Sequence, residues 1–245
     1  MINGFILAIQ FLTRIPINKQ VKFNKKNIKN SLMFYPIVGL FIGILTCIPF
    51  IVIPFTEFRI SAILAILIYF WITGGLHADG LADTLDGFLG GNSAEKTQEI
   101  MKDSRLGMFG VMGIVLLILA KYSLYISVSI YPVFIVIAIT NSRFAGLHVL
   151  NNYKTPSTGL ASIMSNSRIR HNEYILLIFY MITLAIYNKF YIISTLIAIL
   201  TSRIIADKSI KKLSYITGDI IGASIEISEI TSLLTLWGIK VWILS

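Results

Sequence analysis

The fold is decided by an uncharged stretch near the N-terminus, which reads LMFYPIVGLFIGILTCIPFIVIPF at residues 32–55. It is longer than the ~20 residues that a straight helix needs to cross the hydrocarbon core of a bilayer. Its prolines and glycines are compatible with a membrane helix whose neighbours satisfy the freed backbone groups. The stretch therefore predicts a helix that spans a membrane.

The whole chain has the composition of a membrane protein. Of its 245 residues, 56% are apolar and only 13% are charged, whereas roughly 25% are charged in an ordinary soluble domain. The mean hydropathy is +0.78. So much apolar surface has to face something other than water, which argues against a soluble globular enzyme and against a disordered chain. We expect an all-α, polytopic protein whose partner is the lipid bilayer.

Seven apolar segments are candidates for membrane spans. They lie at residues 32–55, 60–74, 107–122, 124–140, 174–187, 190–206 and 230–244. Several are shorter than ~20 residues, so we expect them to borrow flanking residues or to sit in a locally thinned bilayer. The first twelve residues lack the features of a secretory signal and are expected to lie in the membrane interface. The sequence predicts a single domain, residues 1–245, with about seven transmembrane helices and an interfacial N-terminal helix.

The distribution of charge predicts the orientation. Long connections at residues 13–31, 75–106, 141–173 and 207–229 hold most of the Lys and Arg residues, whereas the connections around 56–59, 122–123 and 188–189 are short. Basic loops stay in the cytoplasm, so we expect a multi-pass protein of the cell (cytoplasmic) membrane whose active site faces the cytoplasm. The net charge of +9 would also suit a nucleic acid. Because the basic residues flank apolar stretches, we expect no nucleic-acid partner.

The acidic residues are concentrated in two stretches, residues 79–103 and 219–229. Nine of the twelve lie there: Asp79, Asp83, Asp86, Glu95, Glu99, Asp103, Asp219, Glu226 and Glu229. Carboxylates that served only solubility would be spread evenly over the loops. Clustering beside apolar spans suggests a divalent cation, and carboxylate oxygens suit Mg²⁺ or Mn²⁺ better than zinc.

The first acidic stretch reads GGLHADGLADTLDG at residues 74–87. In a helix, Asp79, Asp83 and Asp86 fall at i, i+4 and i+7 on one face, where three like charges are unfavourable unless a cation neutralises them. We expect these aspartates to be catalytic and to bind metal, with His77 as a ligand or general base. The alternative is a solvated acidic helix start, in which Asp79 only complements the helix dipole.

The second acidic stretch, EIMKDSRLG at residues 99–107, mixes both signs of charge. Lys102 and Arg105 are suited to clamp phosphate oxygens, and Asp103 is a further candidate metal ligand. The alternative is a set of salt bridges within one helix. Arg14 and Arg143 are two more candidates for phosphate binding, although snorkelling at the membrane boundary is the commoner role of such residues.

The third acidic stretch, TGDIIGASIEISE at residues 217–229, is more apolar. Asp219, Gly222, Glu226 and Glu229 fall at i, i+3, i+7 and i+10, along one face of the predicted helix. Ionisable groups among isoleucines are costly unless they face the interior of a bundle, so we predict Asp219 and Glu226 as metal ligands opposite the first stretch. The alternative is a purely structural polar contact between helices.

Carboxylates at the cytoplasmic end of a span favour one class of chemistry. A cation transporter would bury its acids near the bilayer midplane, in broken and often repeated spans, and no repeat is evident. A metal-dependent transferase that cleaves a phosphoanhydride would place its acids where a soluble nucleotide can reach them. The metal would neutralise the diphosphate, and a carboxylate or His would activate an incoming hydroxyl.

The motifs resemble those of the cobalamin synthase family, the adenosylcobinamide-GDP ribazoletransferases. The resemblance is carried, in chain order, by Thr13–Pro16, Tyr35–Gly39, Gly74–Gly87, Met101–Gly107 with Gly110, and Thr217–Asp219 with Gly222, Ala223 and Glu226–Glu229. It implies a Mg²⁺-dependent membrane enzyme of the last step of cobalamin nucleotide-loop assembly. Such an enzyme transfers the adenosylcobinamide-phosphate moiety from adenosylcobinamide-GDP to α-ribazole or its 5′-phosphate, releases GMP, and gives adenosylcobalamin or its 5′-phosphate.

The resemblance also carries expectations for single residues. Asp79, Asp83, Asp86, Asp103 and Asp219 would serve as metal and catalytic residues, and Lys102 and Arg105 would bind phosphate. The chain departs from the family pattern at Ala78 and over most of residues 141–173. Two alternatives stay open, a CDP-alcohol phosphotransferase, whose Ala-Arg pair is missing here, and a divalent-cation transporter. A homo-oligomer is also left open.

Overall fold

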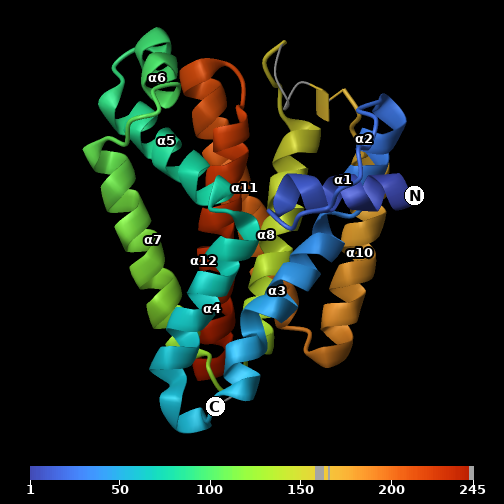
Figure 1. Cartoon of the computed structure of the whole chain (residues 1–245), viewed down its shortest axis with the longest axis vertical. Helices are drawn as coiled ribbons and strands as arrows, with labels where there is room; N and C mark the ends of the chain where they lie inside the picture. The colour runs from blue at the N-terminus through green and yellow to red at the C-terminus, as the bar shows by residue number, and fades with distance from the viewer. Residues whose placement is uncertain (158–162, 165, 243–245) are drawn as a thin grey trace.

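The computed structural model describes residues 1–157, 163–164 and 166–242. Within these ranges the chain forms eleven α-helices and one 3₁₀ turn, and no strand (Figure 1). Most of the helices run along the long axis of the molecule. The expectation of an all-α bundle is confirmed.

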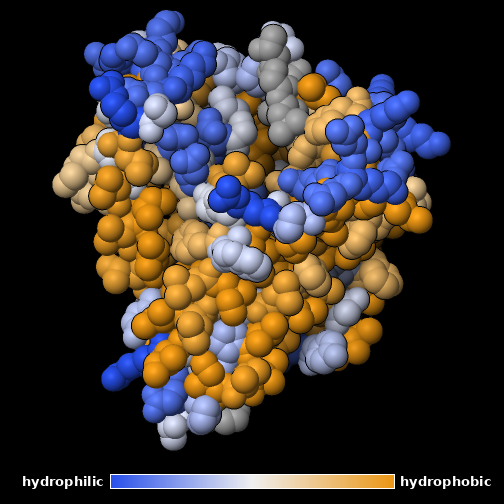
Figure 2. Space-filling model, in the orientation of Figure 1, coloured by the Kyte–Doolittle hydropathy of each residue, from blue (hydrophilic) through white to orange (hydrophobic). Residues whose placement is uncertain are grey.

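Four helices in the described ranges are long and apolar enough to cross a membrane. They are α3 (Tyr35–Val52), α7 (Met108–Ser127), α8 (Val133–Asn152) and α12 (Gly218–Trp242). Figure 2 shows an apolar belt around the middle of the visible face, with hydrophilic residues above and below it, as a protein in a bilayer requires. The molecule is thus a polytopic membrane protein.

The other predicted spans are less regular. The helix α4 (Phe58–Thr73) is bent by 88° against α5 (Leu76–Gly90), and the pair would make a fifth span. The helices α10 (Arg170–Tyr187) and α11 (Tyr191–Leu213) also run along the bundle (Figure 1). Neither meets the length and composition expected of a span. The predicted number of about seven therefore corresponds to seven lengthwise helices, of which four or five are clear spans.

Two predicted boundaries were wrong. The short link expected around residues 122–123 lies inside α7, and the chain turns only after Ser127. The polar residues at that point include Lys121, which is fully buried and ion-paired, so the chain has no need to leave the bundle there. The long connection expected at 207–229 is also largely helical, because α11 continues to Leu213 and α12 begins at Gly218.

The remaining short helices lie at one end of the bundle. The helix α1 (Ile2–Leu12) crosses the bundle axis and packs on α2 (Lys25–Leu32), in keeping with the predicted interfacial helix (Figure 1). At the same end lie α5 and α6 (Ala94–Met101), which fill the connection expected at 75–106. We call this the polar end of the bundle.

The helix α12 is the centre of the packing. It contacts α5, α7, α8 and α11, and Ala223, Leu233 and Leu236 on it are buried. Its first turns lie at the polar end, beside α5. The arrangement brings the first and the third acidic stretches of the sequence together.

Candidate active site

Two glycines allow α5 and α12 to cross at very short distance. A Cβ atom at Gly80 would lie 2.9 Å from the Cα of Asp219, and one at Gly222 would lie 3.1 Å from the carbonyl oxygen of His77. Any larger residue at Gly80 would push the helices apart. The crossing places Asp219 beside the turn of α5 that carries Asp79 and Asp83.

These three aspartates form an acidic cluster at the crossing. Asp79 and Asp219 line the same cavity, and the negative charges of Asp79 and Asp219 act on Asp83. In the described part of the chain, the carboxylates of Asp79 and Asp83 have no hydrogen-bond or ion-pair partner. Asp219 has no cationic partner there, and it accepts a 3.2 Å bond from the Thr217 hydroxyl and a bond from its own backbone N–H. The protein therefore leaves this negative charge uncompensated.

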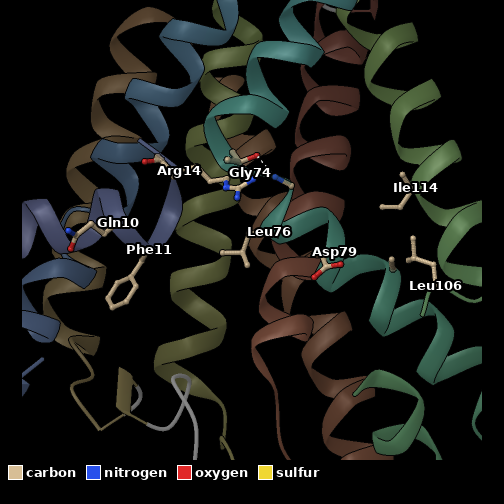
Figure 3. A pocket seen from close by; sticks show the side chains of 12 residues that line it. Gln10, Phe11, Arg14, Gly74, Leu76, Asp79, Leu106 and Ile114 are labelled. Carbon is tan, nitrogen blue, oxygen red and sulfur yellow. Dashed lines mark hydrogen bonds between the residues drawn. The ribbon is translucent and has the colours of Figure 1, made fainter. Parts of the chain in front are cut away.

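A second, larger cavity begins at Asp79 and extends to Arg14 (Figure 3). Its volume is about 650 Å³, and its wall combines the end of α1, the α4–α5 junction and the start of α7. The backbone N–H of Arg14 donates to the carbonyl of Ile72 at 2.7 Å, which fixes the loop after α1 against the end of α4. The cavity thus has a cation at one side and a free carboxylate at the other.

The α4–α5 junction is shaped to admit the side chain of Arg14. Gly74 has φ +66°, and a Cβ there would lie only 1.9 Å from the Cδ of Arg14. Gly75 has φ +70° but no atom near its missing Cβ. Glycine is the residue that reaches this left-handed region without strain. The double glycine accordingly produces the 88° bend and the space that Arg14 occupies.

Asp86, the third aspartate of the predicted stripe, has other partners. Its two carboxylate oxygens accept the backbone N–H groups of Gly107 at 2.8 Å and Gly110 at 2.9 Å. These groups belong to the start of α7, where backbone donors lack partners within the helix. Asp86 is thus turned away from the acidic cluster and caps α7.

The residues of the second acidic stretch lie at the surface of the polar end. Asp103 and Arg105 form a 2.7 Å ion pair with each other. Hydrogen bonds from the side chain and the backbone N–H of Arg105 lower the pKa of Asp103 to about 2. Arg105 and Lys102 are exposed. The structure does not place these three side chains in either cavity.

Arg143 and Glu226 lie deep in the bundle, in a network that we call the buried ion network. Its charged members are Lys121, Arg143, Glu226 and Glu229, all at most 1% exposed. Lys121 pairs with Glu226 at 3.1 Å and also with Glu229, and Arg143 lies 3.4 Å from Glu229. The hydroxyl of Tyr69 donates to Glu226 at 2.9 Å. Two buried cations therefore balance two buried carboxylates.

Comparison with known proteins now identifies the family. The family model described as cobalamin-5-phosphate synthase matches residues 4–237. The chain belongs to this family. Three relatives named adenosylcobinamide-GDP ribazoletransferase are each 34% identical to it. The relative from Treponema denticola aligns over 98% of this chain and 99% of its own length. The relative from Clostridium botulinum strain Langeland aligns over 96% of this chain and 98% of its own length, and the one from Alkaliphilus oremlandii over 97% and 98%, respectively. No solved structure matches the chain.

The family assignment favours the transferase prediction over the two alternatives. The match runs through all three acidic stretches and both cavities, and the relatives are covered almost from end to end. The resemblance that the sequence motifs indicated is therefore confirmed. A CDP-alcohol phosphotransferase and a divalent-cation transporter are not supported.

The acidic cluster of this cobalamin-5-phosphate synthase family member fits a hard cation by its donors. Over the described ranges, no group of three or more His, Cys, Asp or Glu side chains is already arranged to hold an ion. The free carboxylates of Asp79 and Asp83, with Asp219 beside them, are nevertheless the oxygen ligands that Mg²⁺ prefers.

Lys121 and Tyr69 were not among the predicted functional residues, and Glu229 was predicted only as one of the clustered acids. Lys121 is the only charged residue in the apolar segment 107–122, and Glu229 lies one helical turn after Glu226. Ionisable groups inside a span almost always pair with one another. Lys121 in one apolar segment and the pair Glu226 and Glu229 in another could therefore have predicted an ion pair between the two helices.

Proposed function

We propose that this chain is a membrane transferase that moves the adenosylcobinamide-phosphate moiety from adenosylcobinamide-GDP to α-ribazole or its 5′-phosphate, and releases GMP. The observation that carries the proposal is the near full-length match to relatives that are named for this reaction. The site supports it, because a cavity with Arg14 at one side and Asp79 at the other suits a diphosphate that is attacked by a hydroxyl.

Arg14 is the residue that binds the diphosphate of the donor. Its guanidinium presents a planar set of N–H donors that matches phosphate oxygens. The short backbone bond to Ile72 and the space above Gly74 fix the position of this side chain in the larger cavity. Positive charge there stabilises the negative charge that develops on the departing phosphate.

Asp79 is placed to accept the proton of the attacking hydroxyl. It lines both cavities and has no partner of its own in the described structure. The hydroxyl oxygen of the acceptor forms a bond to the phosphorus next to the cobinamide, and the bond from that phosphorus to the bridging oxygen breaks. GMP leaves with the electron pair, and the hydroxyl proton passes to Asp79.

Asp83 and Asp219 are the remaining carboxylates of the cluster, and we assign them to a Mg²⁺ ion, which leaves Asp79 to take the proton. Bound there, Mg²⁺ would neutralise the diphosphate and make its phosphorus easier to attack. Without a cation, the uncompensated carboxylates would repel the donor. The proposed requirement for a cation therefore follows from the charge of the cluster.

We further propose that the polar end faces the cytoplasm. The basic loop between α1 and α2 lies there, and basic loops remain on the cytoplasmic side. The larger cavity opens at this end, beside α1 (Figure 3). Nucleotide substrates that are made in the cytoplasm would reach Arg14 without crossing the bilayer.

The deciding experiment is a GMP-release assay with the purified chain in liposomes. With Mg²⁺, adenosylcobinamide-GDP and α-ribazole, we expect GMP to be released in step with the formation of adenosylcobalamin. Omitting α-ribazole is the control and should abolish the release. Release of CMP from a CDP-alcohol, or nucleotide-free uptake of divalent cations, would overturn the proposal.

A further inference from the structure

The smaller cavity that adjoins the acidic cluster has mostly apolar walls. Its volume is about 200 Å³, and it lies among α1, α3, α5, α8 and α12. The apolar part of its lining consists chiefly of Phe11, Leu12, Tyr35, Leu150, Ile221 and Ile225. Apolar cavities of about 150 Å³ bind benzene in proteins. This cavity therefore has room for a flat aromatic ring system, and it is too small for a corrin macrocycle.

One buried polar group in this cavity has no partner. His77 lines the cavity and is 5% exposed, and its Nδ1 has no hydrogen-bond partner anywhere in the described structure. The Tyr35 hydroxyl, on the same wall, already donates to the sulfur of Met164 at 3.6 Å. Buried polar atoms are rarely left unpaired, so the imidazole of this cavity-lining residue has hydrogen-bonding capacity that the protein itself does not use.

The two cavities meet at the reacting position. Asp79, Leu76 and Phe11 line both of them, so a molecule that fills the smaller cavity ends where the larger one begins. A nucleoside whose base lies in the smaller cavity would place its sugar beside Asp79. The donor diphosphate would approach the same carboxylate from the side of Arg14.

We propose that the smaller cavity is the subsite for the aromatic base of the acceptor nucleoside, and that the imidazole of His77, a residue of its wall, donates a hydrogen bond to a ring nitrogen of this base. This inference rests on the proposed function, in which the acceptor is α-ribazole. Its base is a benzimidazole, a flat apolar bicycle with one ring nitrogen that is free to accept a hydrogen bond. Neutral histidine supplies one N–H donor for it.

The guanine base of the donor is a poorer occupant of the same cavity. Guanine has several donors and acceptors along its edges, and the apolar walls would leave most of them unpaired. A benzimidazole needs one polar partner, and His77 is the one unpaired buried group that the described lining offers. The mostly apolar walls and the single unpaired polar group therefore match the base of the acceptor better than the guanine of the donor.

The first test measures binding without any turnover. We would determine the affinity of free benzimidazole for the full chain in lipid nanodiscs by equilibrium dialysis. Saturable binding is expected, and Ile221→Trp, which fills the cavity, should weaken it at least about tenfold. Ile227→Trp is the matched control, because Ile227 is also partly buried on α12 but does not line the cavity. Equal binding by both variants, or no saturable binding, would refute the subsite.

The second test separates the two substrates kinetically. His77→Leu should raise KM for α-ribazole about tenfold, through loss of one buried hydrogen bond, and leave KM for adenosylcobinamide-GDP within about twofold. His77→Asn keeps an N–H near the position of Nδ1 and should recover most of the affinity. A rise in KM for the donor instead would overturn the assignment. If the wild-type chain released no GMP, the proposed function would fail, whereas the dialysis would still decide about the cavity.

Discussion

Asp83 is the aspartate on which the negative charges of the other aspartates act most strongly. It lies one turn after Asp79 on α5, and the charges of Asp79 and Asp219 both act on it. Asp83→Asn removes a ligand oxygen charge without changing the size of the side chain, so we expect GMP release to fall at least about 100-fold. The melting temperature should stay the same or rise, because a source of like-charge repulsion is removed.

The control for this substitution is Glu99→Gln, in the second acidic stretch. Glu99 is exposed and pairs with Lys96 at 2.9 Å on the surface of α6. Exposed pairs contribute about 0–1 kcal/mol to stability, and this one is outside both cavities. Activity within about twofold of wild type is expected. If Asp83→Asn has near-normal activity, the proposed role of Asp83 in metal binding is wrong.

Asp86 offers a way to separate capping from metal binding. Its carboxylate accepts two backbone N–H groups at the start of α7. Asp86→Ala should destabilise the protein by about 1–2 kcal/mol, as the loss of a helix cap does. Asp86→Asn keeps one oxygen acceptor and should retain more of the stability and of the GMP release. If Asp86→Asn melts like the wild type but has no activity, Asp86 binds metal or substrate in addition to capping α7.

The aspartates and arginines also show how far a candidate site can be predicted from residues alone. Charged residue types next to apolar segments were identified correctly as unusual. Some of these charges, such as that of Asp79, have no partner in the described part of the protein and can bind a ligand. Others, such as that of Arg143, are neutralised by an ion pair within the protein. The partner of Arg143 is Glu229, which is 86 residues away in the sequence. A pairing between residues so far apart in the sequence cannot be predicted from a local sequence motif.

At the scale of elements, the α4–α5 junction combines a bend with a binding position. We expect Gly74→Ala to displace Arg14, since the new Cβ would overlap the arginine side chain. KM for adenosylcobinamide-GDP should rise at least about tenfold, the loss expected for one charge-assisted contact to phosphate. The measurement is steady-state kinetics with α-ribazole at saturation.

Gly75→Ala is the matched control for the junction. Gly75 has nearly the same positive φ as Gly74, 70° against 66°, but its Cβ would meet no atom within 4 Å. Both substitutions carry a similar strain of about 1–2 kcal/mol for a left-handed alanine. A selective increase in KM with Gly74→Ala would therefore come from Arg14. Equal effects of the two substitutions would attribute the loss to the backbone.

The elements themselves were predictable where the polarity changes sharply. The uncharged stretch 32–55 became α3, and the interfacial helix was expected from the apolar residues before Thr13. Boundaries failed where a polar residue stays inside the bundle, as Lys121 does in α7. A helix was considered for the acidic stretch that became α5. The helix α6 was left in a predicted connection, although its sequence, AEKTQEIM, is made largely of strong helix formers.

At the scale of the whole molecule, the buried ion network joins the spans α4, α7, α8 and α12. Lys121→Met would leave the charges of Glu226 and Glu229 balanced only by Arg143. Breaking a buried pair in this way costs about 3–5 kcal/mol. For a chain of this size we expect the melting temperature in detergent to fall by at least about 6 °C.

Two variants test the cause of this destabilisation. Lys121→Met combined with Glu229→Gln removes one charge of each sign and should recover part of the loss, because the buried charges balance again. Lys96→Met breaks only an exposed pair and should shift the melting temperature by less than about 2 °C. If the double variant is no better than the single one, the buried lysine stabilises the bundle through its cation–π contact with the Tyr69 ring, 3.9 Å from the ring centroid, and not through the balance of buried charges.

The number of passes can be tested at α10, the lengthwise helix with the least burial against the bundle. Among the described residues, three helices, α7, α8 and α10, separate the surface positions Ser104 and Lys189. If all three cross the bilayer, these positions lie on opposite sides. In a Cys47→Ser background, which removes the single native cysteine, we expect Ser104→Cys to react with an impermeant maleimide only from the cytoplasmic side and Lys189→Cys only from the outer side. Labelling of both from the same side would mean that α10 does not span the membrane, which would agree with its failure to meet the length and composition of a span.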